Sequence, residues 1–462
     1  MAISSPGLGS GLNINSIVSQ LVAVESQPVQ LLQNKSTTLQ TRMSVFGQIK
    51  SELAALKDAA SALNSATTWN SKSLTSSNSA AVTGTVTTDA LASTFSITVI
   101  NLAKGQSVYS GAVTTGFPIT ADDNFTITSA NGNVQTVAVK VGDTLDSFAA
   151  KINATSTANG VSVSVVTNSA GTKQLMFRSS SIGVKAAFEI TTTSSDLQQF
   201  AYSGANTASM FSSSTAIDAK ANIDGIDVSS ETNTLTNAVP GVTLNLLQES
   251  TVTQPVTAQI AVAVDKDAIK AKIQAFQDAY NKLYADLKTQ TAYNASTKTG
   301  GPLLGDNTAT GLQNMLRNLV GTVVPSTVSS VSRLSNLGLE IQSDGSLKTN
   351  STKLDSALQN PSNVKAFFGS STGDATEHGV TKRIYDFAFG ALAVGGSVST
   401  HSTAFQKSID QNTATIDKLN LHIVAYQKQL LAQYTALDKN MAQLNSLSTF
   451  VSQQVAQWNK TG

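Results

Sequence analysis

The sequence predicts an α+β, multidomain fold with terminal helical coiled-coil legs, a mixed helical domain, and nested antiparallel β domains inserted as a head. Near both ends of the 462-residue chain, apolar residues recur every three or four positions, as in helices that pack along a narrow seam. Between about residues 73 and 265 the period changes to two, which is typical of strands in antiparallel sheets with one solvated face. A chain of this length can bury several cores.

The first helical pattern begins at Ile14 and continues through Ile17, Leu21 and Val24. Pro28 removes a backbone donor and clashes with the preceding turn, so we expect the helix to break or kink there. The pattern then resumes, with a period near 3.5, at Leu39, Met43, Phe46, Ile49, Leu53, Leu56, Ala60 and Leu63.

The second helical pattern runs to the C-terminus. Its stripe comprises Phe405, Ile409, Asn412, Ile416, Leu419, Ile423, Tyr426, Leu430, Tyr434, Leu437, Met441, Leu444, Val451, Val455 and Trp458. A polar Asn412 in such a stripe lowers stability but fixes the register of the helices. A helix packed on its own domain is the alternative to a coiled coil between the two ends.

We expect one set of side chains to form the coiled-coil and assembly seam. These are Ile17, Leu21, Val24, Leu39, Met43, Phe46, Ile416, Leu419, Ile423, Tyr426, Leu430, Leu437, Met441 and Leu444.

The middle of the chain carries the strand signals. Phe95, Ile97 and Val99 alternate with polar residues, and Asn131-Gly132 between two alternating runs predicts a hairpin turn. One short helix is expected from Thr144 to Ile152. The helical period returns between Ile269 and Leu287.

Two short elements follow in the second half. LEIQSDGSLKT predicts a hairpin around Asp344-Gly345. NPSNVKAFFG predicts a short helix that Asn360 caps, that begins at Pro361 and that ends at Gly369.

Composition argues against several classes of function. Only 13% of the residues are charged, the net charge is +1, and no Lys/Arg block occurs, so we expect no nucleic-acid partner. The chain has no cysteine, which excludes disulfides and thiolate metal sites. The most apolar run, at 387–396, is far shorter than the roughly 20 residues that span a bilayer, so no membrane partner is expected. The first basic residue is Lys35, which does not fit a secretory signal peptide.

No catalytic constellation is found. Gly7, Gly9 and Gly11 form G-x-G-x-G rather than G-x-G-x-x-G, and too few residues precede them for a strand. His378, His401 and His422 show no metal-ligand spacing, and no G-x-S-x-G elbow occurs. The pairs Asp122-Asp123 and Asp224/Asp227 read as turn formers. We therefore expect no enzyme activity, no cofactor and no metal.

The opening SSPGLGSGLNINSIVSQLVAVESQPVQLL resembles the N-terminal signature of the flagellar filament-capping family, also called flagellar hook-associated protein 2. Further stretches resemble that family in the same order, and 142–180 resembles the small repeat of flagellins and hook-associated proteins. The family-like stretches are 222–247, 301–320, 334–358 and 436–455. Asn13 stands where the family has Asp, and Asn caps a helix nearly as well.

The resemblance implies an extracellular structural protein at the tip of the bacterial flagellum. It would leave the cell unfolded through the type III export channel and assemble as a ring, usually a pentamer. There it would retain flagellin and promote its folding and insertion. Implied partners are further copies of the chain, flagellin, hook–filament junction proteins and a cytoplasmic export chaperone. Gly7, Gly9 and Gly11 would belong to an export and assembly tail that is disordered until it binds.

Two other functions stay open. One is an outward-facing adhesin role of the β head, with a host glycoprotein as partner, in addition to capping. The other is a flagellin-like or hook–filament junction protein.

We expect four domains. They are a terminal disordered or coiled-coil segment (1–42 and 405–462), a helical leg domain (43–72 and 266–404), a β domain (73–110 and 216–265), and an inserted β domain (111–215) with the flagellin-type repeat at about 142–190.

Overall fold

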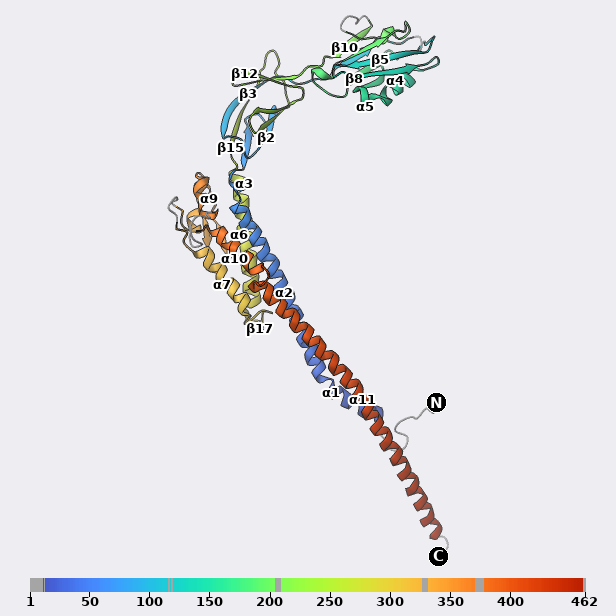
Figure 1. The fold of residues 1–462 in the computed structure, drawn as a ribbon, viewed down its shortest axis with the longest axis vertical. Coiled ribbons are helices and arrows are strands. Elements are labelled where there is room, and N and C mark those ends of the chain that lie inside the picture. Colours follow the sequence, from blue (N-terminus) through green and yellow to red (C-terminus); the bar gives the residue numbers. More distant parts are fainter. Residues whose placement is uncertain are drawn as a thin grey trace. The chain divides into compact units, whose positions relative to one another are not determined.

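The computed structural model describes residues 11, 13–114, 117, 119–203, 209–325, 331–369 and 378–459. Its contacts divide the chain into two units, one made of Met1–Trp69 with Lys270–Gly462 and the other of Asn70–Ile269. The first unit consists mainly of helices and the second mainly of antiparallel sheets (Figure 1). The predicted α+β multidomain class is therefore confirmed.

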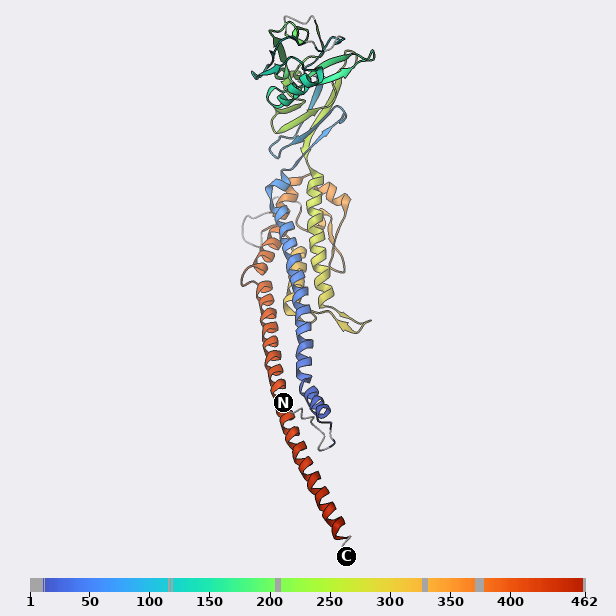
Figure 2. The ribbon, with the colours of Figure 1, turned by 90° about the vertical axis from the view of Figure 1, so that its right-hand side faces the viewer.

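The first unit contains a helical bundle and, near both ends of the chain, helices that extend beyond it (Figure 2). Its helices are α1 (Ile14–Glu25), α2 (Gln27–Asn64), α3 (Ala66–Trp69), α6 (Lys266–Thr291), α7 (Asn307–Gly321), α8 (Ser351–Ala357), α9 (Pro361–Gly369), α10 (Val380–Leu392) and α11 (Ser397–Trp458). Two small hairpins join them, β16 (Tyr293–Asn294) with β17 (Thr299–Gly300), and β18 (Leu339–Ile341) with β19 (Leu347–Thr349).

The break near Pro28 lies at Ser26, between α1 and α2. Pro28 sits in the first turn of α2, where its missing N–H costs no hydrogen bond and its fixed φ suits a helix. Asn13 caps α1, because its side chain accepts a hydrogen bond from the Ser16 amide at 3.0 Å. The expectation for Gly7 and Gly9 lies outside the described residues.

The apolar face of α6 is fully buried in the bundle, at Ile269, Ile273, Phe276, Tyr280, Leu283 and Leu287. The Tyr280 hydroxyl donates to the Gly345 carbonyl at 3.1 Å and ties α6 to the β18–β19 hairpin. Gly345 has a φ of +91°, and a Cβ there would lie 2.3 Å from the Tyr284 hydroxyl oxygen. This turn, predicted around Asp344-Gly345, therefore requires glycine.

The second unit contains two β cores. The first is a sandwich of a five-stranded and a three-stranded sheet, with strand orders β1-β15-β3-β11-β12 and β13-β14-β2. Its strands are β1 (Lys72–Ser76), β2 (Val82–Val86), β3 (Ser93–Asn101), β11 (Ala219–Ile223), β12 (Ile226–Ser230), β13 (Thr234–Val239), β14 (Val242–Leu246) and β15 (Val256–Val264). The predicted alternation appears in β3, where Phe95, Ile97 and Val99 point into the core.

The second core is formed by the segment between β3 and β11. Its sheets have the orders β10-β4-β8-β7 and β6-β5-β9. The elements are β4 (Ser107–Ser110), β5 (Asp123–Ser129), β6 (Val134–Val139), α4 (Leu145–Ala154), α5 (Ser156–Asn159), β7 (Val161–Thr167), β8 (Lys173–Ser179), β9 (Phe188–Thr192) and β10 (Met210–Ser214). Phe125, Phe148 and Phe177 are fully buried in it. Asn131-Gly132 makes the β5–β6 turn, as predicted. The helix predicted from Thr144 to Ile152 is α4, and Thr144 is its N-cap residue.

Candidate functional site

Helices α1 and α11, which lie near the two ends of the chain, form an antiparallel pair. Ile14 and Val18 of α1 and Leu430 of α11 form a buried cluster. Half-buried apolar side chains pack against it from both helices, namely Leu21, Val22, Tyr426, Leu431 and Tyr434. We call this contact the α1–α11 seam. It brings the two heptad segments together in one chain.

The pair continues where α2 packs on α11. The Asn412 side-chain amide donates to the Leu32 carbonyl at 2.7 Å, and Asn412 is buried. Nearer the bundle, Phe46 and Phe405 meet edge to face with their ring centroids 5.9 Å apart. The partners on α11 move from Leu430 through Asn412 to Phe405 as the chain runs from α1 into α2. The helices are therefore antiparallel.

The predicted seam residues occupy three environments. Phe46 and Leu430 are buried, and Val24, Leu437 and Leu444 are exposed by 63%, 47% and 58% of their surface. The remaining predicted residues are half-buried, namely Ile17, Leu21, Leu39, Met43, Ile416, Leu419, Ile423, Tyr426 and Met441. Whether they all act in assembly stays a prediction.

The predicted seam set leaves out several residues that the structure buries on α1, α2 and α11, and three of them lie on α1 and at the start of α2. Ile14, Val18 and Val29 are exposed by only 1%, 2% and 6% of their surface. The four-residue spacing between Ile14 and Val18 is the sequence signal that identifies these two residues, because residues at i and i+4 share one helix face.

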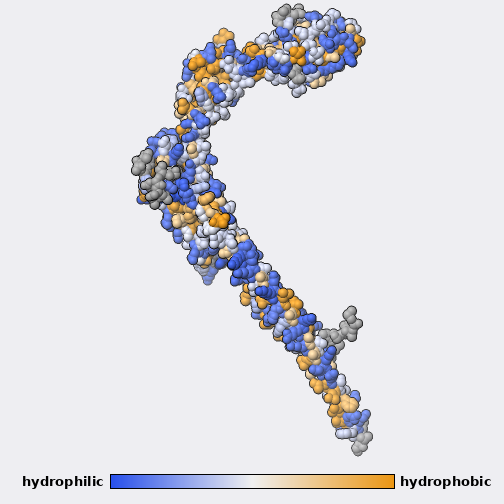
Figure 3. All heavy atoms as spheres, viewed as in Figure 1, coloured by the Kyte–Doolittle hydropathy of each residue, from blue (hydrophilic) through white to orange (hydrophobic). Residues whose placement is uncertain are grey.

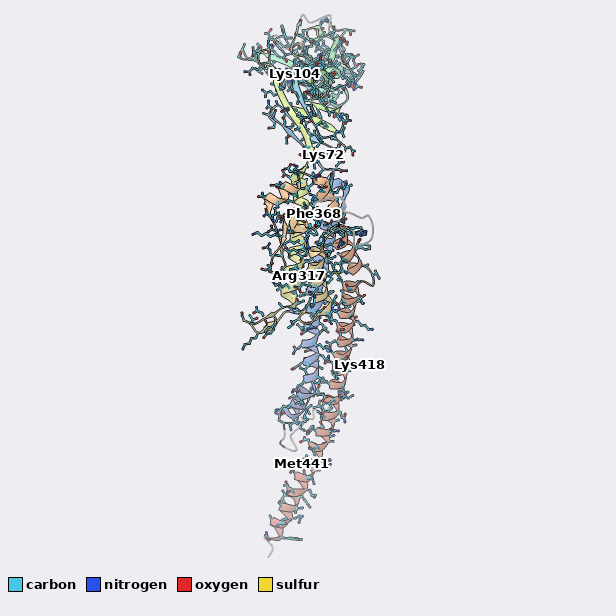
Figure 4. All side chains as sticks on the ribbon, turned by 90° about the vertical axis from the view of Figure 1, so that its left-hand side faces the viewer. Lys72, Lys104, Arg317, Phe368, Lys418 and Met441 are labelled. Atoms are coloured by element: carbon cyan, nitrogen blue, oxygen red, sulfur yellow. The ribbon has the colours of Figure 1, made fainter. Side chains whose placement is uncertain are left out.

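Helix α11 extends past α1 and carries exposed apolar residues along its last turns (Figures 1 and 3). They are Leu437, Leu444, Leu447, Phe450, Val451, Val455 and Trp458, each exposed by 47% or more. We call this set the terminal stripe. Met441, labelled in Figure 4, lies on the same segment. Contiguous exposed apolar surface of this kind marks a site of interaction with another protein or a membrane.

The polar groups where α11 begins in the bundle have structural roles. The Asp306 side chain accepts hydrogen bonds from the Thr308 and Ala309 amides at 2.9 and 3.0 Å and so caps α7. His401 Nε2 lies 2.7 Å from Asp306 Oδ2, and its ring packs between Phe46 and Phe405. This pair joins the start of α11 to α7 and α2.

The described residues contain no group of three or more His, Cys, Asp and Glu side chains placed to hold a metal. Within the same residues, no helix is long and apolar enough to cross a bilayer.

Sequence comparison identifies the family. The model of the flagellar hook-associated protein 2 C-terminus matches residues 216–446, and that of its N-terminus matches residues 10–106. The chain belongs to the flagellar hook-associated protein 2 family. The flagellin hook IN motif matches residues 124–181, within the inserted β core. The resemblance inferred from the sequence is thereby confirmed.

Two relatives match this chain along nearly its whole length. The A-type flagellar hook-associated protein 2 of Pseudomonas aeruginosa is 30% identical over 97% of this chain and 96% of its own. The flagellar hook-associated protein 2 of Escherichia coli K12 is 28% identical over 98% of both chains.

One solved structure shares the fold. The flagellar cap protein FliD D1-D2-D3 domains from Escherichia coli align with a TM-score of 0.57 and 24% identity, over 78% of this chain and 99% of that one. The flagellar hook-associated protein 2 family consists of structural proteins of the flagellum and is not a family of enzymes. This agrees with the absence of a catalytic motif from the sequence.

Proposed function

We propose that the chain caps the distal tip of the bacterial flagellar filament as a ring of five copies. The ring retains exported flagellin and promotes its folding and insertion as the filament grows. Membership of the hook-associated protein 2 family supports capping in general. The terminal stripe of α11 is the structural observation that carries the assembly role, since its apolar residues are each exposed by 47% or more.

The terminal stripe is suited to binding a filament end whose open sites change during growth. A filament end presents a new set of open sites after each subunit is added, so the cap has to release and rebind. A single helix with half-buried and exposed apolar positions offers many small contacts that can form in turn. Each contact stabilises binding modestly, because full burial of one leucine contributes roughly 1.5–3 kcal/mol.

Export precedes this role. The chain would pass the type III channel unfolded, and an export chaperone would cover the terminal stripe in the cytoplasm as an amphipathic helix lying in a groove. After export the same stripe would be free to contact neighbouring copies, hook–filament junction proteins and the filament end.

An adhesin role of the β domains, with a host glycoprotein as partner, is a second candidate. One observation favours it: Phe211 is 49% exposed and stacks on Tyr109 with ring centroids 5.3 Å apart. An exposed ring stacked on a half-buried tyrosine provides an apolar surface with a polar hydroxyl nearby. Binding of the full chain to a glycan array, compared with that of Phe211→Ala, tests this role.

Complementation tests the capping role. The gene is returned to a strain whose own cap gene is deleted, and flagellin is measured in the medium and on the cells. The proposal predicts that the wild-type chain restores filaments and lowers free flagellin. Filaments that stay absent, with flagellin still lost to the medium, would contradict it, provided that the chain is exported.

A further inference from the structure

A carboxyl group lies buried between two helices of the bundle. Glu52 of α2 has only 7% of its side chain exposed. Its Oε1 accepts hydrogen bonds from Lys282 Nζ of α6 at 2.7 Å and from Gln48 Nε2 at 3.1 Å. The same Gln48 amide donates to Asp286 Oδ2 of α6 at 3.0 Å. Two carboxyl groups therefore share one amide and one ammonium group.

The two oxygens of Glu52 differ. Oε1 has two donors, whereas Oε2 is buried without a hydrogen-bond partner in the unprotonated arrangement. An unpaired buried carboxylate oxygen is costly. A proton on Oε2 would remove this cost, with the Asp286 carboxylate, which accepts from the same Gln48 amide, as the acceptor for the resulting hydroxyl.

We propose that Glu52 and Asp286 share one proton and form a pH-sensitive latch that holds α2 against α6. Lys282 is 3.6 Å from Asp286 Oδ2, so one ammonium group faces both carboxyls. The charged groups of α10, which also packs on α2, are engaged elsewhere. Lys382 pairs with Asp386 at 2.5 Å, and Arg383 Nε donates to the His378 carbonyl.

The titration behaviour agrees with this geometry. Burial, followed by the hydrogen bond with Asp286, raises the pKa of Glu52 above its ordinary 4.5. The hydrogen bond from Glu52 lowers the pKa of Asp286 below its ordinary 3.8. At a pH between the lowered pKa of Asp286 and the raised pKa of Glu52, the cluster therefore holds a single shared proton, as expected for two interacting carboxyls.

The sign of the pH effect follows from linkage. Because the folded protein holds the Glu52 proton more tightly than the unfolded chain, this stabilisation is complete below pH 4.5. It is lost as the pH rises toward the raised pKa of Glu52. Above that value both carboxyls are ionised, and one lysine faces two negative charges. The latch is thus closed between the lowered pKa of Asp286 and the raised pKa of Glu52, and it loosens as the pH rises through the latter.

Hydrogen–deuterium exchange of the full chain tests the latch. The readout is the protection of the α2 amides around Glu52, corrected for the pH dependence of intrinsic exchange. We expect this protection to fall by up to about tenfold per pH unit between pH 4.5 and the raised pKa. Glu52→Gln keeps a permanent donor toward Asp286, so its protection should not change over that interval. Glu340→Gln removes the exposed partner of Lys353 and should keep the wild-type profile.

Identical pH profiles for wild type and Glu52→Gln would overturn the proposal. A second measurement does not depend on how the Gln variant folds. The Glu52 carboxyl carbon, followed by NMR in the wild-type chain, should titrate above 4.5. Its midpoint should shift down in Asp286→Asn. A wild-type midpoint at or below 4.5 would likewise overturn the latch.

Discussion

Asn412 of α11 donates its side-chain amide to the backbone carbonyl of Leu32 of α2, across 380 residues of sequence. The surrounding contacts of these helices are mainly apolar, so this bond can form in only one register. A buried polar residue in a helix seam lowers stability and specifies alignment. The structure thus gives the Asn412 predicted from the heptad stripe a specific partner.

Replacing Asn412 by Leu should raise the thermal stability of the α2–α11 pair and loosen its register. The extra apolar contact adds stability, while the bond that fixes alignment is lost. Disulfide trapping reports the register, because the chain has no native cysteine. A Val18→Cys/Leu430→Cys pair is in register, and a Val18→Cys/Leu437→Cys pair is one heptad away.

In the wild-type background only the in-register pair should cross-link efficiently, and in Asn412→Leu both should. Equal selectivity in the two backgrounds would show that Asn412 does not set the register.

Substitutions of two leucines of α11 should differ in how much they weaken the docking of α1 on α11 in the isolated chain. Leu430→Ala removes a side chain buried against Ile14 and Val18 and should cost about 2–5 kcal/mol of α1–α11 docking. Leu444→Ala changes a residue that is 58% exposed, so its effect should stay within about 0.5 kcal/mol. Hydrogen exchange of the α1 amides measures docking. Similar effects of the two substitutions would be inconsistent with the α1–α11 seam.

The double variant Leu437→Asp/Leu444→Asp should lose assembly while its fold remains. Both side chains are exposed in the single chain, so the charges disrupt only contacts with other molecules. We expect flagellin to appear as monomer in the medium and hooks to lack filaments. Circular dichroism checks the fold, and pull-down with the export chaperone checks the second proposed use of the stripe. Normal filaments with normal chaperone binding would rule out a role for these two leucines.

Gly345→Ala should destabilise the helical unit much more than Gly305→Ala. Both glycines have positive φ, at +91° and +79°, but only Gly345 faces a neighbour, the Tyr284 ring. The backbone term of roughly 1–2 kcal/mol is common to both, and overpacking adds about 1–3 kcal/mol at Gly345. Chemical denaturation of the two variants gives the difference. Equal midpoints would mean that the hairpin moves away from Tyr284.

A fragment of residues 70–269 should fold alone. Its two ends are paired strands, with Lys72 of β1 opposite Val264 of β15, and both of its β cores are built from its own residues. Cooperative thermal unfolding with a β-type circular dichroism spectrum is the expected result. A fragment without either property would show that the β unit depends on the helices.

The period of the apolar residues in the sequence was sufficient to predict the helices and strands that bury one face. The alternation of Phe95, Ile97 and Val99 predicts β3 because every second side chain enters the core. Strand β2, by contrast, has the sequence VTGTV and was not singled out. Its Gly84 leaves no room for a Cβ beside the Thr243 carbonyl, and this close approach of two strands depends on tertiary structure.

The candidate site likewise depends on tertiary contacts that the sequence pattern does not show. A heptad stripe shows which face of α11 is apolar, but not where α1 ends along it, so Leu430 and Leu444 look alike in the sequence. Glu52 was missed for a related reason. One acidic residue between Ile49 and Leu53 carries no signal until α6 brings Asp286 and Lys282 next to it.

Electron cryo-microscopy of isolated filaments incubated with the purified chain tests the capping proposal most directly, because it reports location and stoichiometry together. The account predicts density at one end of each filament, the distal one, with five copies of the chain in a ring and α11 in contact with the last flagellin subunits. Density along the filament shaft or at the hook end, or bare distal ends at saturating protein, would contradict it.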